Sequence, residues 1–195
     1  MPHRLKFIIC GNHEKEEQLR KGLRRAEAGR VKSEAPVYLE RRKNARRADG
    51  LRIWGWPFTW QDQAPEEVPE GLDILVTHVP PKGILDHSLR DGSRAGSSRL
   101  TAALAKLKKP PRLHLFGHIH EGHGTFRSEP LAAAADAKGL SIEELGGEKA
   151  GDKARQTLYV NAAIANDGVA SEAAKPCIVI DLPLVAREPA REVSA

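Results

Sequence analysis

Cysteines and long hydrophobic runs are scarce in this sequence, and each scarcity excludes a class of protein. The chain of 195 residues has two cysteines, Cys10 and Cys177, and each stands in a short apolar run. Such a pair predicts buried, reduced thiols and excludes the disulfide framework of a small secreted domain. We therefore expect an intracellular, cytoplasmic protein.

No apolar stretch of the chain approaches the roughly 20 residues that a helix needs to cross a bilayer. The first four residues are not followed by the apolar core of a signal peptide. The sequence therefore predicts a soluble protein without membrane contact. No internal repeat is visible, and 195 residues with 40% apolar content suffice for one domain with its own core.

The charge excess is mild, with a net charge of +5 and a pI near 9.3. It suits a phosphate-bearing ligand but does not by itself indicate nucleic acid. Basic residues gather at 20–32 and 41–47, where they would permit contacts with a phosphate backbone. Because no aromatic stacking platform accompanies them, we interpret them as a solvated helix face and an exposed turn.

Apolar runs with strand character alternate with helical spacing, which predicts an α/β domain. We expect strands at residues 5–10, 37–39, 51–54, 73–77, 112–116, 157–161 and 177–182, and helices at 14–30 and 100–109. The first run reads as a strand buried on both faces. The basic stretch 40–50 reads as a turn, and the close spacing of the later strands predicts an antiparallel part of the sheet.

Residues 1–184 are predicted to form one domain. A surface insertion is expected at 128–155, which is rich in Ala, Gly, Lys and Glu and has no sustained apolar face. Residues 185–195 are predicted to form a disordered tail.

Polar side chains able to bind metals or transfer protons follow three of the expected strands, where each strand ends. They are Asn12, His13, His78, His118 and His120. In an α/β sheet, the carboxyl ends of neighbouring strands meet at one edge. We therefore expect these five side chains to cluster at one end of the sheet.

The block Gly117-His118-Ile119-His120 places two imidazoles two residues apart, so that in extended backbone both project to one side and can reach two metal ions. The alternative is a surface loop with ordinary histidines. Asn12 can offer a neutral amide oxygen to a cation, while its alternative role is to cap the following helix. The N terminus of that helix would favour an anionic phosphate nearby.

Gly11-Asn12-His13-Glu14, the strand-terminal His78 and the 117–120 block together resemble the calcineurin-like metallophosphoesterase superfamily, and in the same order. Segments 74–81 and 113–124 are most similar to its small phosphodiesterase-like subgroup. The similarity runs from about residue 3 to residue 182. The resemblance implies a β-sandwich flanked by helices, with a dinuclear metal site at the strand ends.

Carried over to this chain, the resemblance makes Asn12, His78 and His118 ligands of one metal ion and His120 a ligand of the other. His13 becomes the general acid or transition-state stabiliser. The family uses two divalent ions, and the mixed nitrogen and oxygen ligands suit Mn, Fe or Zn. The implied reaction is hydrolysis of a phosphate ester, a phosphodiester by the subgroup resemblance, by a metal-activated hydroxide.

The family pattern also includes an Asp-x-His and a Gly-Asp motif upstream, and neither precedes Asn12 here. The chain therefore resembles the C-terminal two-thirds of the domain, without its first strand-helix units and with an incomplete first metal site. Without carboxylates, the remaining ligands should hold a cation loosely. A shortened gene model, an alternative start and a non-catalytic remnant or scaffold are all compatible with this pattern.

Overall fold

The computed structural model describes residues 5–28, 36–40, 45–58, 64–89, 91–128, 156–165 and 175–183. The predicted tail lies outside these ranges, and of the predicted insertion only Ser128 is described. The backbone N–H of Ser128 donates to the carbonyl of Thr157 at 3.0 Å, and the N–H of Thr157 donates to Ser128 Oγ at 3.0 Å. The first residue of the predicted insertion is therefore hydrogen-bonded to a residue just beyond the insertion's predicted end.

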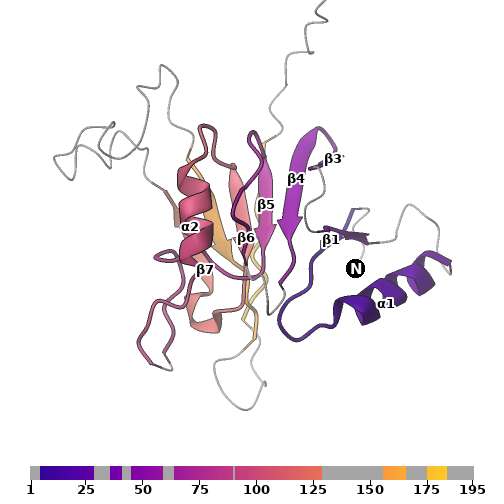
Figure 1. Cartoon of the computed structure of the whole chain (residues 1–195), viewed down its shortest axis with the longest axis horizontal. Helices are drawn as coiled ribbons and strands as arrows, with labels where there is room; N and C mark the ends of the chain where they lie inside the picture. The colour runs from indigo at the N-terminus through magenta and orange to yellow at the C-terminus, as the bar shows by residue number, and fades with distance from the viewer. Residues whose placement is uncertain are drawn as a thin grey trace, which may run out of the picture.

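A mixed sheet of six strands, in the order β3-β4-β5-β6-β8-β7, forms the centre of the molecule (Figure 1). The strands are β3 (Arg46–Ala48), β4 (Leu51–Trp56), β5 (Ile74–Thr77), β6 (Leu113–Phe116), β7 (Gly124–Arg127) and β8 (Leu158–Asn161). The four inner strands run parallel, while β3 and β7 pair antiparallel with their neighbours. The expected α/β class is confirmed. The antiparallel pairing in the later part of the sheet joins β8 to β7 and not to the expected strand at 177–182.

Helix α2 (Ser98–Ala105) covers one face of this sheet (Figure 1). Its first turn is capped by Ser97, whose side chain accepts a hydrogen bond from the N–H of Leu100. The helix is shorter than the predicted 100–109, but its apolar side reaches the core. Residues from β4, β5, α2 and their connections form that core: Trp54, Trp56, Phe58, Ala64, Val68, Leu72, Leu75, Val79, Leu100 and Ala103.

The N-terminal segment forms a separate parallel sheet of two strands, β1 (Phe7–Ile8) and β2 (Val37–Tyr38), with helix α1 (Glu16–Ala28) beside it (Figure 1). The prediction of a strand over 5–10 buried on both faces is wrong, because β1 is two half-buried residues long. Its partner β2 is equally short. After β1 the backbone no longer pairs with β2, and the carbonyl of Cys10 accepts a hydrogen bond from the N–H of Phe58 instead.

Two strands and one extended segment differ from the sequence-based expectations. The stretch 40–50, expected to be a turn, contains β3, and β7 was not expected. Residues 177–182, expected to be a strand, lie in a described segment, 175–183, that has no strand. Cys177 in this segment is exposed, contrary to the prediction, whereas Cys10 is buried as expected.

Within the described parts of the chain, no helix combines the length and the apolar character needed to span a membrane.

Candidate metal centre

The inner strands bring the predicted ligands to one edge of the sheet. His78 follows β5, and Gly117 and His118 follow the adjacent parallel strand β6. The two strand ends are linked because the N–H of Gly117 donates to the carbonyl of His78 at 3.0 Å. Asn12 reaches the same edge from the segment after β1. The fold thus joins three segments that are distant in sequence.

Three side-chain atoms converge at this edge. Nε2 of His78 lies 2.8 Å from Oδ1 of Asn12 and 3.1 Å from Nδ1 of His118. The backbone N–H of Asn12 also points to the same Nε2, at 3.3 Å. We call Asn12, His78 and His118 the donor cluster. Contacts across 66 and 40 residues of sequence show that tertiary structure assembles it.

In either protonation state of Nε2 of His78, one contact in the donor cluster is unfavourable as a hydrogen bond. If Nε2 of His78 carries a proton, it donates that proton to one neighbouring acceptor. The same proton then repels the N–H of Asn12, which also points at Nε2. If Nε2 carries no proton, its lone pair faces the lone pairs of the Asn12 amide oxygen. A shared cation removes this conflict, because the amide oxygen and both neutral imidazole nitrogens can donate lone pairs to it.

Burial keeps both imidazoles of the donor cluster neutral. Burial lowers the pKa of His78 to about 4, with smaller contributions from the charges of His118 and His13. Burial also lowers the pKa of His118, assisted by the charges of His120 and His13. Neutral imidazole is the form that binds metals, so both rings are ready to act as ligands at pH 7.

His118 has a left-handed backbone conformation, with φ of 68°. For a residue other than glycine, such a conformation costs on the order of 1–3 kcal/mol and persists only when the surroundings impose it. Here two hydrogen bonds fix the residue that follows His118. The N–H of Ile119 donates to the carbonyl of Gly117 at 2.8 Å, and the carbonyl of Ile119 accepts from Nδ2 of the buried Asn161 at 2.8 Å. Strain of this kind is typical of functional sites.

His13 and His120 lie at the margin of the donor cluster. His13 is exposed, and His120 is half-buried at the start of the short helix η2 (His120–Gly122). Their charges contribute to the lowered pKa of His118, which places both within electrostatic range of it. Nowhere in the described ranges do three His, Cys, Asp or Glu side chains form a group able to hold a metal. The structure thus brings three of the five predicted residues into contact.

Asn161 connects two loops of the site, a role that the sequence motifs did not indicate. It is fully buried at the end of β8, where its Nδ2 donates to the carbonyls of Leu85 at 3.0 Å and Ile119 at 2.8 Å. Its Oδ1 accepts from the N–H of Ala163 at 3.1 Å. Asn161 therefore holds the β5–α2 loop and the loop of His118 together. A polar residue ending an apolar strand was the available sequence signal.

Two of the three donor–donor spacings in the donor cluster match those around a shared divalent ion. Ligand atoms about 2.0–2.2 Å from a metal lie about 3 Å apart at neighbouring coordination positions, and the spacings of 2.8 and 3.1 Å agree with this. Two imidazoles and one amide oxygen suit Mn, Fe or Zn better than Ca. For a second ion, the predicted set offers only His120. The described residues therefore do not complete a dinuclear centre.

Comparison with known proteins gives a consistent relationship. No protein-family model matches the chain. The chain is 29% identical over 213 residues to Metallophosphoesterase domain-containing protein 1 of Homo sapiens and to that of Mus musculus, covering 94% of this chain and 56% of each relative. It is 33% identical over 142 residues to a probable rhamnogalacturonate lyase C of Emericella nidulans, covering 63% of this chain and 13% of that protein.

The chain thus spans about half the length of its two metallophosphoesterase relatives. The alignment with them includes nearly all of this chain. The α/β fold agrees with the fold class that the resemblance implies. This chain is therefore related to the metallophosphoesterases.

Proposed function

We propose that this chain contributes to a metal-dependent phosphoesterase, in which Asn12, His78 and His118 hold one divalent ion. The observation that carries the proposal is the convergence of their three donor atoms, spaced 2.8 and 3.1 Å apart. The relationship to metallophosphoesterase domain-containing proteins supports phosphoester hydrolysis. The resemblance of segments 74–81 and 113–124 to the phosphodiesterase-like subgroup favours a phosphodiester substrate.

Each residue has a separate task in this proposal. The bound ion would supply Lewis acidity toward a phosphoryl oxygen. His78 and His118 bind it as neutral imidazoles, while Asn12 adds an oxygen without adding charge. His13, exposed in the same segment as Asn12, would face substrate and donate a proton to the leaving oxygen. His120 would serve a second ion of a dinuclear centre.

A non-catalytic metal-binding or scaffold role is the second candidate. One observation favours it: the described part of the chain contains no group of three His, Cys, Asp or Glu side chains suited to a metal. Cations need anionic ligands to offset the cost of losing their water, so a neutral donor cluster binds more weakly than one with carboxylates.

Calorimetric titration of Zn²⁺ and Mn²⁺ tests the ligand assignment. We expect about one ion per chain. His118→Ala should lower the affinity by more than the 10–100-fold that loss of an outer-shell partner typically causes, because it removes a direct ligand. His120→Ala should have a smaller effect, and His87→Ala, at an exposed position, should match the wild type. Equal losses for His118→Ala and His120→Ala would contradict the assignment.

Turnover separates the two candidate functions. A chain that binds about one ion and cleaves a chromogenic phosphodiester, with His13→Ala abolishing cleavage but not metal binding, supports the phosphoesterase. A chain that binds the ion without any measurable cleavage supports the scaffold role.

A further inference from the structure

Phe58 packs against both histidines of the donor cluster. It lies two residues after β4 ends, and its side chain is only 6% exposed. Its ring centroid is 5.3 Å from that of His78, edge to face, and 6.3 Å from that of His118, in a stacked arrangement. The two imidazoles in turn lie 4.7 Å apart. The three rings therefore form one packed group.

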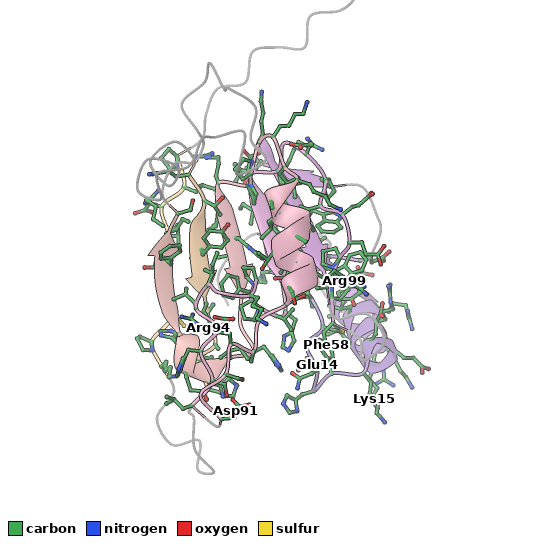
Figure 2. The ribbon with its side chains drawn as sticks, turned by 60° about the vertical axis from the view of Figure 1, so that its left-hand side comes forward. Glu14, Lys15, Phe58, Asp91, Arg94 and Arg99 are labelled. Atoms are coloured by element: carbon green, nitrogen blue, oxygen red, sulfur yellow. The ribbon has the colours of Figure 1, made fainter. Side chains whose placement is uncertain are left out.

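The backbone of Phe58 contacts the third segment of the site. Its N–H donates to the carbonyl of Cys10 at 3.0 Å. Cys10 is 1% exposed and lies two residues before Asn12. Figure 2 labels Phe58 and also Glu14, a residue of the same N-terminal segment as Cys10 and Asn12. One residue thus contacts the segments that supply all three donor atoms.

Histidine ligands need such support because rotation about their second side-chain torsion is only weakly restricted. A rotation of the imidazole plane of His78 would move Nε2 away from the centre of the cluster. The flat ring of Phe58 restricts this rotation by offering an edge-to-face contact to one imidazole and a face to the other. An aliphatic side chain offers neither surface.

We propose that Phe58 is a positioning residue for the metal centre, with its ring orienting His78 and His118 and its backbone N–H anchoring the segment of Asn12. This inference rests on the proposed function, in which the donor cluster binds a divalent ion. Phe58 touches no reacting atom and acts through the histidines. Its buried apolar ring also limits the access of water to the cluster.

The test replaces the aromatic ring while keeping an apolar side chain. Phe58→Leu should weaken the binding of Zn²⁺ and Co²⁺ about 10–100-fold and change the visible absorption of the Co²⁺ form, which reports ligand geometry. Phe58→Tyr keeps the ring and should restore affinity and spectrum. Leu100→Ala is the matched control, because Leu100 belongs to the same core but lies on α2. It should lower stability and leave affinity and spectrum unchanged.

A second measurement uses the metal-free chain. In NMR spectra, ring currents from Phe58 should displace the imidazole carbon-bound proton signals of His78 and His118. Phe58→Leu should abolish the displacement, and Leu100→Ala should keep it. If Phe58→Leu does not fold, Phe58→Met replaces it in both measurements, because the flexible methionine side chain fills irregular space without an aromatic ring.

The outcomes distinguish the two proposals. If the wild type binds neither ion, the proposed function fails, and the metal role of Phe58 fails with it, whatever the NMR spectra show. If the wild type binds an ion and Phe58→Leu binds it with equal affinity and an unchanged spectrum, only the positioning role is overturned. Loss of affinity to the same extent in Leu100→Ala would also overturn it, because general destabilisation would then explain the effect.

Discussion

At the residue scale, His78 and His114 differ in what their nitrogens face. Nε2 of His78 faces donor atoms of the cluster, whereas His114 is enclosed within the sheet. Nε2 of His114 lies 2.9 Å from the hydroxyl of Thr77, which itself donates to the carbonyl of Val79 at 2.8 Å. The hydroxyl is therefore the acceptor, and Nε2 of His114 carries the proton. His114 is a structural histidine that must remain neutral.

This environment predicts an acid-sensitive fold. Burial lowers the pKa of His114 to about 3, while in the unfolded chain it returns to about 6.5. Below pH 6.5 the imidazole therefore binds a proton in the unfolded state but not in the folded state. The free energy of unfolding consequently falls as the pH falls. The slope is at most about 1.4 kcal/mol per pH unit, so the loss from pH 7 to 5 is about 2 kcal/mol.

Denaturant titrations at several pH values measure this loss. His78 and His118 also have lowered pKa values and act in the same direction, so the wild-type curve contains their contributions too. The share of His114 is the difference between the wild type and His114→Phe. An identical pH dependence of the two proteins would show that His114 is not responsible.

At the element scale, Gly55 sets how closely the N-terminal sheet approaches the central sheet. A Cβ at Gly55 in β4 would lie 2.6 Å from Cβ of Leu39 and 3.1 Å from a side-chain methyl of Ile9. Such distances leave no room for another side chain. The close approach also brings the segment after β1, including Asn12, to the edge where His78 lies.

Gly55→Ala should therefore destabilise the protein and disturb the site. Separating the sheets should cost about 1–3 kcal/mol in the free energy of unfolding, as overpacking usually does. It should also weaken Zn²⁺ binding by moving Asn12 away from His78. Chemical denaturation and calorimetry measure the two effects.

Gly22→Ala provides the matched control for Gly55→Ala. Gly22 lies inside α1, and a Cβ there would meet nothing within 4 Å. Because alanine favours the helical conformation more than glycine does, Gly22→Ala should raise the free energy of unfolding by about 0.5–1 kcal/mol. The affinity for Zn²⁺ should not change. Similar effects from the two substitutions would refute the packing argument.

At the scale of the whole molecule, the described residues contain one neutral donor cluster, and the chain spans 56% of the length of its metallophosphoesterase relatives. We expect this chain to hydrolyse phosphodiesters poorly. Each electrostatic contact missing from a transition state typically costs a factor of about 100–1,000 in rate. A variant extended at the N terminus with Asp-x-His and Gly-Asp motifs should turn over a chromogenic phosphodiester faster in excess Mn²⁺ by at least one such factor. Equal turnover by the two proteins would mean that carboxylate ligands are not what limits this chain.

The sequence by itself determined the features that depend on local pattern. Apolar β-branched runs ending at polar residues correctly predicted β5, β6 and β8, and with them the placement of His78 and His118 after adjacent strands. The common edge of parallel strands then predicted their proximity, which the distance of 3.1 Å confirms. The roles of these residues as metal ligands stay a prediction, because coordination was inferred from resemblance.

Only the tertiary structure decided which segments pair and what surrounds the donors. The runs 5–10 and 177–182 have similar apolar character, yet the first forms a strand of two residues and the second forms none. A strand needs a partner for its backbone groups, and a pattern within one segment does not specify that partner. Tertiary contacts also decide that Cys177 is exposed and that Cys10, which likewise lies outside a strand, is buried. The packing of Phe58 on two imidazoles likewise arises from contacts between residues far apart in the chain, which no local pattern encodes.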